Sequence, residues 1–287
     1  MQTKIEPTWS LNSQYNSILL WKASCFDILP QIEDHSVDLI LADLPYGTTA
    51  CAWDSVLPMD KLWNEYKRVI KDRGAIVLTS SQPFTWALCA SNPEWFRYEI
   101  IWEKPNGTNP LLAKKQPLRV HENILVFYKK HPTYNPQITQ GHVKYGGFSD
   151  NKKYVGEVYG GEKNKLISKH RDNDGSRYPR SVQKFAHDSK GVKGHPTKKP
   201  LALMLWLVKT YTNVNDVVLD NTMGGGTTGV ACVMAQRKFV GMELEKKYFD
   251  MAVDNIYSAS KNILHLDVSH PVLHNEKPDT ERIVVIP

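Results

Sequence analysis

A glycine-rich turn between a predicted strand and a predicted helix constrains the fold of this chain more than any other feature. Residues 216–220 have the apolar pattern of a buried strand, and residues 227–236 have that of a helix. Three consecutive glycines at 224–226 let the backbone approach a ligand closely, and the helix start offers unpaired N–H groups. Glu243 ends the next predicted strand, where nucleotide-binding βαβ units place a ribose-binding carboxylate. The pattern predicts an α/β fold that binds an adenosine-containing cofactor.

The other predicted elements alternate between strands and helices and form two halves of one sheet. In the first half we predict strands at 17–22, 37–43, 74–79, 98–102 and 123–128, and helices at 59–70 and from Pro83. In the second half we predict helices at 200–211 and 246–260 and a strand at 238–243. This order is typical of an open, mostly parallel sheet with helices on both faces. The chain has 287 residues, 41% of them apolar, which is enough for a full core of this kind.

A basic segment, residues 130–194, interrupts these regular elements. It is rich in Gly, Lys, Asn, Asp and Tyr and has no sustained period, but its aromatic content argues against disorder. Between Pro105 and His195 there are 17 Lys and Arg against 7 Asp and Glu, whereas the rest of the chain has 19 against 23. This asymmetry indicates a surface for a polyanion, although charge alone leaves a solvated basic loop as an equal alternative. We predict an irregular inserted substructure.

A second motif, Asp43-Leu-Pro-Tyr46, follows a predicted buried strand and therefore lies at the carboxyl edge of the sheet, where α/β proteins bind ligands. An aspartate, a kinked backbone and an aromatic ring at one strand end suit a planar amine. The ring can stack on a base, while the carboxylate and a main-chain carbonyl accept the two amine hydrogens. This grip favours a tetrahedral nitrogen whose lone pair can attack a methyl carbon, because these interactions strengthen in the transition state.

These motifs, with three others, resemble those of one known family, the DNA N6-adenine and N4-cytosine methyltransferases. Asp43-Leu-Pro-Tyr46 resembles the family's Asp-Pro-Pro-Tyr motif, and Leu219-Asp-Asn-Thr-Met-Gly-Gly-Gly-Thr-Thr-Gly-Val-Ala231 is similar to its cofactor motif. Further resemblances are His195-Pro-Thr-Lys-Lys-Pro200, His121-Glu-Asn-Ile-Leu-Val-Phe127 and Gly241-Met-Glu-Leu-Glu245. The catalytic motif precedes the insertion and the cofactor motif follows it, which is the order of the circularly permuted beta class. The resemblance covers about residues 17–130 and 195–260.

The resemblance implies a Rossmann-like methyltransferase domain in two segments, a catalytic half at 17–129 and an S-adenosylmethionine-binding half at 195–267. Residues 130–194 would be the target-recognition insertion. Asp43 and the carbonyl of Leu44 would hold the target amine, Pro45 would complete the kinked turn, and Tyr46 would stack on the base. The residues that the resemblance assigns to the cofactor are Asp220, Thr222, Gly224, Gly226, Thr227, Thr228, Glu243 and Lys199.

The implied partner is double-stranded DNA, from which the target base must be extruded before it can react. Basic side chains of the insertion would contact phosphates and supply much of the affinity. The candidates are Lys144, Lys152, Lys153, Lys163, Lys165, Lys169, Arg171, Arg177 and Arg180. Any one of them taken alone is better explained as an ordinary solvated charge than as a residue that reads a base.

The implied reaction is methyl transfer to adenine N6, since an aspartate at the first motif position is a tendency of the adenine enzymes. Transfer to cytosine N4 stays an alternative because the chemistry serves either amine. A catalytically silent DNA-binding module, a methyltransferase for RNA or protein glutamine, and an NAD-type enzyme also stay open. A restriction–modification role would need a separate nuclease, since no nuclease motif is visible. A homodimer is compatible with the class, although nothing in the sequence establishes one.

Three departures from the family pattern stand out. Leu44 replaces the usual first proline, Asn221-Thr222 replaces Pro-Phe, and Ala23-Ser24-Cys25 stands where many members have Gly-Asp-Cys. The last two remove an aromatic ring and a carboxylate that lie near the cofactor in the family. The two motif acids and Tyr46 are retained, so we expect activity. We also expect the loop 47–54, which contains Trp53, to cover the site.

Several other classes of protein are disfavoured. The four cysteines, at positions 25, 51, 89 and 232, lie too far apart for a zinc knuckle or a disulfide framework, so we expect no metal site. The first 17 residues lack the apolar core of a signal peptide, and the apolar runs are too short to cross a bilayer. We expect a soluble, cytoplasmic protein that does not contact a membrane.

Overall fold

The computed structural model divides the chain into two compact units, residues Met1–Asn135 with Arg180–Pro287, and residues Pro136–Pro179. It describes residues 5–12, 17–47, 55–142, 175–186, 198–263 and 272–273. In the smaller unit, Thr139 and Arg177 form an isolated antiparallel bridge, and the amide of His142 donates to the carbonyl of Gly175. The larger unit contains the regular elements that are described below.

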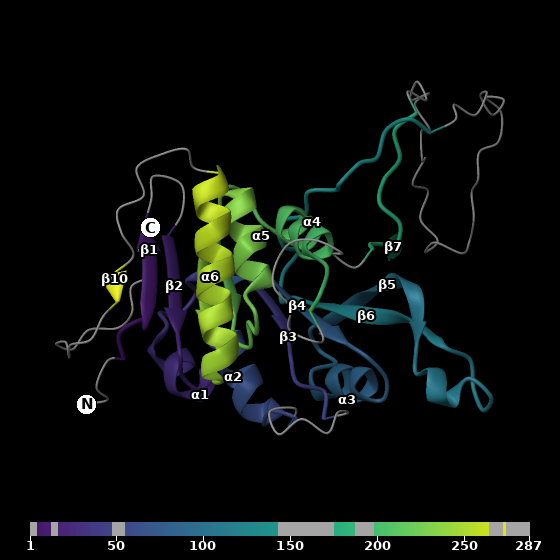
Figure 1. Ribbon diagram of the computed structural model, residues 1–287, viewed down its shortest axis with the longest axis horizontal. Coiled ribbons are helices and arrows are strands. Elements are labelled where there is room, and N and C mark those ends of the chain that lie inside the picture. The colour runs from purple at the N-terminus through teal and green to yellow at the C-terminus, as the bar shows by residue number, and fades with distance from the viewer. Residues whose placement is uncertain are drawn as a thin grey trace, which may run out of the picture. The chain divides into compact units, whose positions relative to one another are not determined.

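The strands of the larger unit form one mixed sheet, in the order β10-β1-β2-β9-β8-β3-β4-β6-β5-β7 over the described residues (Figure 1). Its middle strands, β2, β9, β8, β3 and β4, are parallel to one another, and β6 runs antiparallel to both β4 and β5. The strands are β1 Trp9–Asn12, β2 Ser17–Trp21, β3 Val37–Asp43, β4 Ile70–Ser80, β5 Phe96–Thr108, β6 Arg119–Phe127, β7 Val182–Lys184, β8 Val217–Asp220, β9 Lys238–Met242 and β10 Val272–Leu273.

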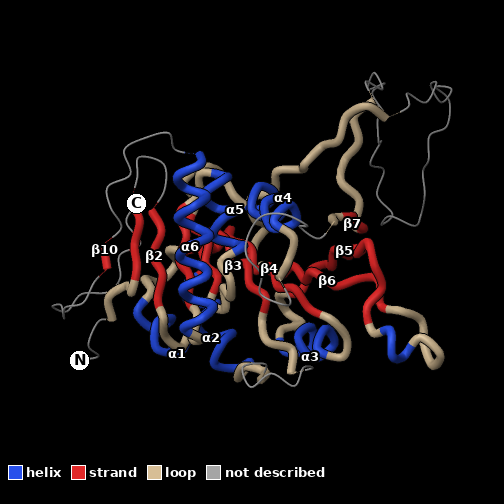
Figure 2. The backbone as a smooth tube through the Cα atoms, in the orientation of Figure 1, coloured by secondary structure: helices blue, strands red, loops and turns tan. Residues whose placement is uncertain are grey.

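Helices cover both faces of this sheet, as the sequence predicts (Figure 2). The α-helices are α1 Cys25–Ile28, α2 Met59–Val69, α3 Phe84–Ser91, α4 Leu201–Tyr211, α5 Thr227–Ala235 and α6 Lys246–Ile263, and short 3-10 turns occupy η1 Leu29–Gln31 and η2 Pro110–Leu112. Proline stands immediately before α2, α3 and α4, where its missing N–H costs no helical hydrogen bond. None of the described helices is both long and apolar enough to cross a membrane.

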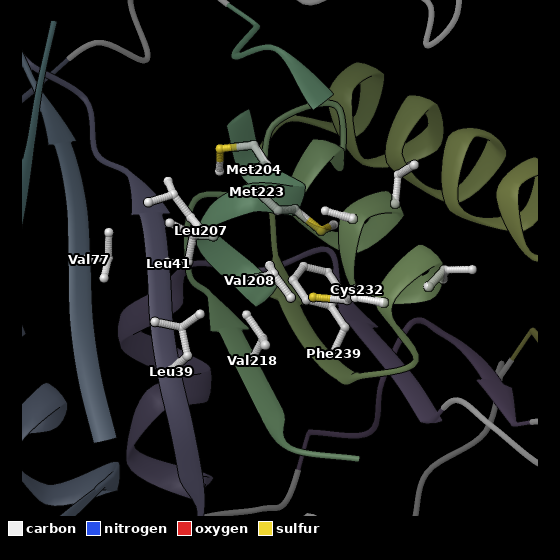
Figure 3. Packing of buried hydrophobic residues seen from close by; sticks show 14 of the residues in the cluster. Leu39, Leu41, Val77, Met204, Leu207, Val208, Val218, Met223, Cys232 and Phe239 are labelled. Atoms are coloured by element: carbon white, nitrogen blue, oxygen red, sulfur yellow. The ribbon is translucent and has the colours of Figure 1, made fainter. Parts of the chain in front are cut away.

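Alternate side chains of β3 enter two separate cores. Leu39 and Leu41 pack with α4, α5 and α6, whereas Ile40 and Ala42 pack with α1, α2 and α3 on the opposite face. Figure 3 shows Leu41 beside Leu207 of α4, and Leu39 lower on the strand, across from Val218 of β8. These four side chains of β3 are fully buried, and burial of a leucine contributes roughly 1.5–3 kcal/mol to the stability of the fold. The central strands therefore have nearly continuous apolar sequences because both of their faces are covered.

Strands β8 and β3 are adjacent and parallel, and the chain leaves them towards opposite edges of the sheet. From β8 the chain passes through α5 to β9 on one side, and from β3 it passes through α2 to β4 on the other side. Right-handed crossovers in opposite directions put α5 and α2 on opposite faces and leave a crevice at the strand ends. Asp220 and Asp43 are the last residues of these two strands, so both predicted motifs open into this crevice.

The structure also contains elements that the sequence did not predict. The outer strand β1, the four-residue helix α1 and the strand β7 lack a clear periodic pattern. β7 lies within 130–194, which the sequence predicts to be irregular, yet it pairs in parallel with β5. Strands β5 and β6 continue well beyond the predicted ranges 98–102 and 123–128 and form a long hairpin.

Candidate active site

A cavity of about 490 Å³ lies at the carboxyl ends of β3, β8 and β9. Its volume is in the range of small-molecule sites. Both sequence motifs contribute to its wall, together with Lys199 from the segment before α4 and Glu243 from the end of β9. The predicted site residues that line it are Asp43, Leu44, Pro45, Tyr46, Lys199, Asp220, Thr222, Gly224, Thr227, Thr228 and Glu243. The structure thus brings the two predicted halves of the site to one cavity.

Asp43 lies at the centre of a hydrogen-bonded network. Its Oδ2 atom pairs with Nζ of Lys199 at 2.6 Å, and its Oδ1 atom accepts from the hydroxyl of Thr79. Burial alone would raise the pKa of Asp43, but the charge of Lys199 and these hydrogen bonds outweigh it and hold the pKa below its ordinary value. The side chain is 29% exposed, so an ionised carboxylate faces the cavity.

Tyr46 is held by contacts on its hydroxyl and on its ring. The hydroxyl donates to Oδ1 of Asp43 at 2.7 Å, and the ring stacks on Phe84 with centroids 5.3 Å apart and an interplanar angle of 23°. Nζ of Lys199 lies 5.5 Å from the centre of the ring. Burial, followed by the charge of Asp43, raises the pKa of Tyr46 well above its ordinary value. Tyr46 is therefore a neutral aromatic group fixed beside the carboxylate.

Lys199 connects this network to the hairpin strands. Its Nζ atom lies 3.2 Å from Oε2 of Glu122, and Glu122 also pairs with Lys104. Lys199 is only 6% exposed, and burial acts to lower its pKa. The negative charge of Asp43 opposes burial most strongly, and the pKa of Lys199 is raised well above its ordinary value. The ammonium therefore remains charged while it is buried between two carboxylates.

Asp220 orders the glycine turn. Its two carboxylate oxygens accept from the amide of Thr222 at 3.1 Å and from the hydroxyl of Thr228 at 2.6 Å. Burial raises the pKa of Asp220 to about 7, because these two hydrogen bonds only partly offset the loss of water. The hydroxyl of Thr222 also donates to the main-chain carbonyl of Asp43 at 3.1 Å. The predicted cofactor turn, residues 221–226, and the predicted catalytic turn, residues 43–46, are thus in direct contact.

Glu243 closes the other side of the turn. Its Oε2 atom accepts from the amide of Gly224 at 2.9 Å, and its Oε1 atom accepts from the amide of Glu245 at 2.8 Å. Burial raises the pKa of Glu243 against the effect of these hydrogen bonds. Gly226 does not line the cavity, but its φ of +78° and its packing against α6 turn the chain into α5.

The replacement at Asn221 is accommodated by a second polar residue. The hydroxyl of Tyr66 on α2 donates to Oδ1 of Asn221 at 2.5 Å, and both side chains are buried. Leu44 is 2% exposed and packs in the core with α1, α2 and α3. Ser24, which stands where many family members have a carboxylate, caps α1 by accepting from the amide of Phe26.

Sequence reasoning missed several residues around the carboxylates, namely Thr79, Lys104, Glu122 and Tyr66. The motif that contains Glu122 was recognised, but nothing in it indicates a partner for Lys199. Of the residues predicted to contact DNA, Arg177 belongs to the smaller unit and Arg180 begins the second part of the larger one. The other seven lie outside the described residues. So do residues 48–54 of the loop with Trp53, and residues 195–197 of the motif His195-Pro-Thr-Lys-Lys-Pro200. Across the described ranges, no cluster of His, Cys, Asp and Glu could hold a metal ion.

Comparison with known proteins finds one family and many relatives. The family model described as DNA methylase, of the N6/N4 methyltransferase type, matches residues 37–254. The Type II methyltransferase M1.MboII of Moraxella bovis is 28% identical over 247 residues, which cover 80% of this chain and 92% of that protein. The DNA adenine methyltransferase YhdJ of Escherichia coli strain K12 is 27% identical over 277 residues, which cover 91% of this chain and 88% of that protein.

Solved structures have the same fold. The M1.HpyAVI–SAM complex superposes with a TM-score of 0.55 at 25% identity, covering 83% of this chain and 98% of that one. The cytosine-N4-specific PvuII DNA methyltransferase superposes with a TM-score of 0.62, covering 92% of this chain and 96% of that one. Its identity is 14%, so that likeness concerns the α/β fold alone.

Proposed function

Because this chain belongs to the DNA methylase family of the N6-adenine and N4-cytosine type, we propose that it transfers a methyl group from S-adenosylmethionine to N6 of an adenine extruded from double-stranded DNA. One contact carries the proposal. The hydroxyl of Thr222 in the cofactor turn donates to the carbonyl of Asp43 in the catalytic turn at 3.1 Å. A methyl donor along one turn and an amine at the other would therefore share a single cavity.

The cavity fits S-adenosylmethionine. Glu243 has a carboxylate in place for the ribose hydroxyls, and Gly224, which has a φ of +51°, lines the cavity without a side chain. Asp220 and Thr228 lie behind the turn and would hold it against the methionine part. When bound, S-adenosylmethionine supplies an electrophilic methyl group on a sulfonium. The acids of the site suit that positive charge.

Asp43 and Leu44 would hold the target amine. Lys199 occupies one position on Oδ2 of Asp43, and a carboxylate oxygen can accept more than one hydrogen bond. The low pKa of Asp43 keeps it ionised as an acceptor at neutral pH. One N–H of the amine would donate a hydrogen bond to this carboxylate, and the other would donate to the carbonyl of Leu44. Pro45 would fix the direction of that carbonyl. The nitrogen lone pair would then point towards the methyl donor.

Tyr46 would present its aromatic surface to the extruded base, backed by Phe84, with which it stacks. For this to occur, Lys199 must leave its position 5.5 Å from the ring centre or share the ring with the base. Lys199 would then serve mainly to hold Asp43 ionised. The sequence motif assigns Lys199 to the cofactor. We therefore propose a second role for Lys199, at the target amine.

Adenine is proposed over cytosine for two reasons. An aspartate begins the catalytic motif, and the relative YhdJ is named a DNA adenine methyltransferase. Transfer to cytosine N4 is the second candidate, since a cytosine-N4-specific enzyme has the same fold. The insertion 130–194 is proposed as the target-recognition region, with the nine Lys and Arg side chains named above on phosphates. Cytoplasmic location and assembly into a homodimer belong to this proposal, and sedimentation of the purified protein tests the latter.

The test uses purified protein, mixed-sequence duplex DNA and S-adenosylmethionine with a labelled methyl group, beside Asp43→Asn, which keeps the shape of the side chain and removes its charge. The products are digested to nucleosides. Label in N6-methyladenine that is lost in the variant supports the proposal, and sequencing gives the methylated site. Label in N4-methylcytosine keeps the mechanism and overturns the base assignment. No label, with cofactor binding shown by calorimetry, would indicate a silent DNA-binding module or another substrate.

A further inference from the structure

The hairpin of β5 and β6 extends beyond the sheet on the same side as the cavity. Strand β4 pairs with β6 over 123–127, and β7 pairs with β5 over 101–103. Beyond these positions β5 and β6 pair with each other out to Thr108 and Arg119. In Figure 1 this part of the chain, coloured teal, leads away from the strands to a small helical turn, η2, at its tip.

The tip has a defined conformation. The hydroxyl of Thr108 donates to the carbonyl of Arg119 at 3.0 Å, and the amides of Leu112 and Gln116 make turn hydrogen bonds of 3.0 Å. A Cβ atom at Gly107 would lie 2.8 Å from Cβ of Leu118, so the two arms are in close contact. The hairpin therefore presents a preformed surface and needs little ordering to bind a partner.

This surface combines exposed apolar side chains with positive charge. Leu111 is 96% exposed at the tip, and three further apolar residues on the hairpin are between 38% and 44% exposed, namely Leu112, Leu118 and Val120. Residues 104–121 contain no Asp or Glu, and their basic side chains are Lys114, Lys115, Arg119 and Lys104, the last of which is nearly buried in an ion pair with Glu122. An apolar tip flanked by one sign of charge fits a polyanion with an apolar interior, which describes the stacked bases of a duplex.

The base of the hairpin forms part of the cavity wall. Lys104, Thr108 and Arg119 line the cavity, and Nη1 of Arg119 donates at 2.7 Å to Oγ of Ser81, which follows β4 directly. A base held in the cavity would therefore have its neighbours in the duplex near the hairpin. Extrusion leaves a gap in the stack, and proteins that distort DNA insert apolar side chains between base steps.

We propose that the hairpin 104–121 binds duplex DNA beside the extruded base, with Leu111 entering the gap in the base stack and Lys114 and Lys115 on the adjacent phosphates. This inference rests on the proposed function. It adds a DNA-contacting element outside the insertion 130–194. A contact between two copies of this chain is the other use of an exposed apolar tip. The absence of acidic residues along 104–121 favours DNA.

The first experiment compares Leu111→Ala with Val214→Ala on duplexes that carry the methylated site found by sequencing. Val214 is 54% exposed and stands just before β8, at the end of the sheet opposite the cavity, so it is a matched control. One duplex is fully paired, and the other has a mismatch opposite the target base. Because a mismatch lowers the cost of extrusion, Leu111→Ala should reduce kcat/KM by about tenfold on the paired duplex and by about twofold or less on the mismatched one. Val214→Ala should match the wild type on both.

A second experiment tests the charges. The double variant Lys114→Gln, Lys115→Gln should lower the slope of log affinity against log salt concentration by about two, since each phosphate contact contributes about 0.9. Normal kinetics of Leu111→Ala on the paired duplex, together with an unchanged salt slope of the lysine variant, would overturn the inference. If the kinetics and the salt slope are normal but Leu111→Ala sediments differently from the wild type without DNA, the hairpin tip forms a contact between two copies of this chain instead. A wild type that binds S-adenosylmethionine but methylates no DNA would overturn the proposed function as well.

Discussion

Lys199 and Asp43 are 156 residues apart in the chain, yet Nζ of Lys199 lies 2.6 Å from Oδ2 of Asp43. The pair joins the segment before α4 to the end of β3. It places a buried positive charge behind the carboxylate that we propose as the acceptor of the target amine.

Removal of this charge should alter the pH dependence of the reaction. In Lys199→Met, burial of Asp43 is no longer opposed by a positive partner, so the pKa of Asp43 rises and less of it is ionised. The acidic limb of the kcat/KM profile should move to higher pH, and activity at pH 7 should fall by about a hundredfold, a size usual for a lost charged contact at a reacting group. Lys209→Met, on the exposed side of α4, is the matched control and should leave the profile unchanged. A uniform loss at every pH would contradict the assigned role.

Asp220 should make cofactor affinity depend on pH. Its pKa is about 7 in the ligand-free protein because of burial, and a cationic ligand beside it favours the ionised form. Binding then releases a proton below pH 7, so affinity should rise with pH by up to about tenfold per unit and level off above pH 8. Calorimetry between pH 6 and pH 8 measures this dependence. Asp220→Asn should bind S-adenosylmethionine more weakly, and its affinity should no longer change with pH near pH 7. If affinity rises with pH as steeply in this variant as in the wild type, Asp220 is not the titrating group.

Tyr66 and Asn221 should be energetically coupled. Their hydrogen bond of 2.5 Å is buried beneath the cofactor turn, at a position where the family usually has proline. Asn221→Ala leaves the hydroxyl of Tyr66 buried without this partner, which should lower the free energy of unfolding by about 1–3 kcal/mol. In the Tyr66→Phe background the same substitution should cost less, and urea unfolding of the four proteins gives the coupling energy. Strictly additive effects would show that the hydrogen bond does not form in solution.

The parts of the site that the sequence predicted are those that lie within one strand end or turn. Asp43 and Asp220 could be placed because each ends a strand with an apolar pattern, and strand ends are where such folds bind ligands. Two of the residues that were missed depend on pairing between strands. Thr79 reaches Asp43 because the two residues are direct partners in the parallel pair β3–β4, and Glu122 enters the site because it pairs with Trp102 in the antiparallel hairpin.

The same distinction explains the elements that were predicted and those that were missed. The helix α2 has its buried residues on one face, so its period is visible in the sequence. Strand β7 has three residues, and its side chains are mostly exposed, so the pairing with β5 decides its conformation. Helix α1 has four residues and depends on its Ser24 cap, which is too little for a periodic signal.

Gly226 should tolerate no side chain, because its backbone has a φ of +78° and a Cβ atom there would lie 2.8 Å from Cβ of Ala252 on α6. Gly226→Ala should therefore lower the free energy of unfolding by about 1–3 kcal/mol and weaken cofactor binding, since the strain falls on the turn into α5. Gly225→Ala is the matched control: its Cβ atom would meet the flexible Sδ atom of Met251 at 3.2 Å, and the change should cost less than half as much. Urea unfolding with and without S-adenosylmethionine separates the two effects. Equal losses in both variants would mean that the positive φ at Gly226 is not required, and that the turn binds its ligand in another conformation.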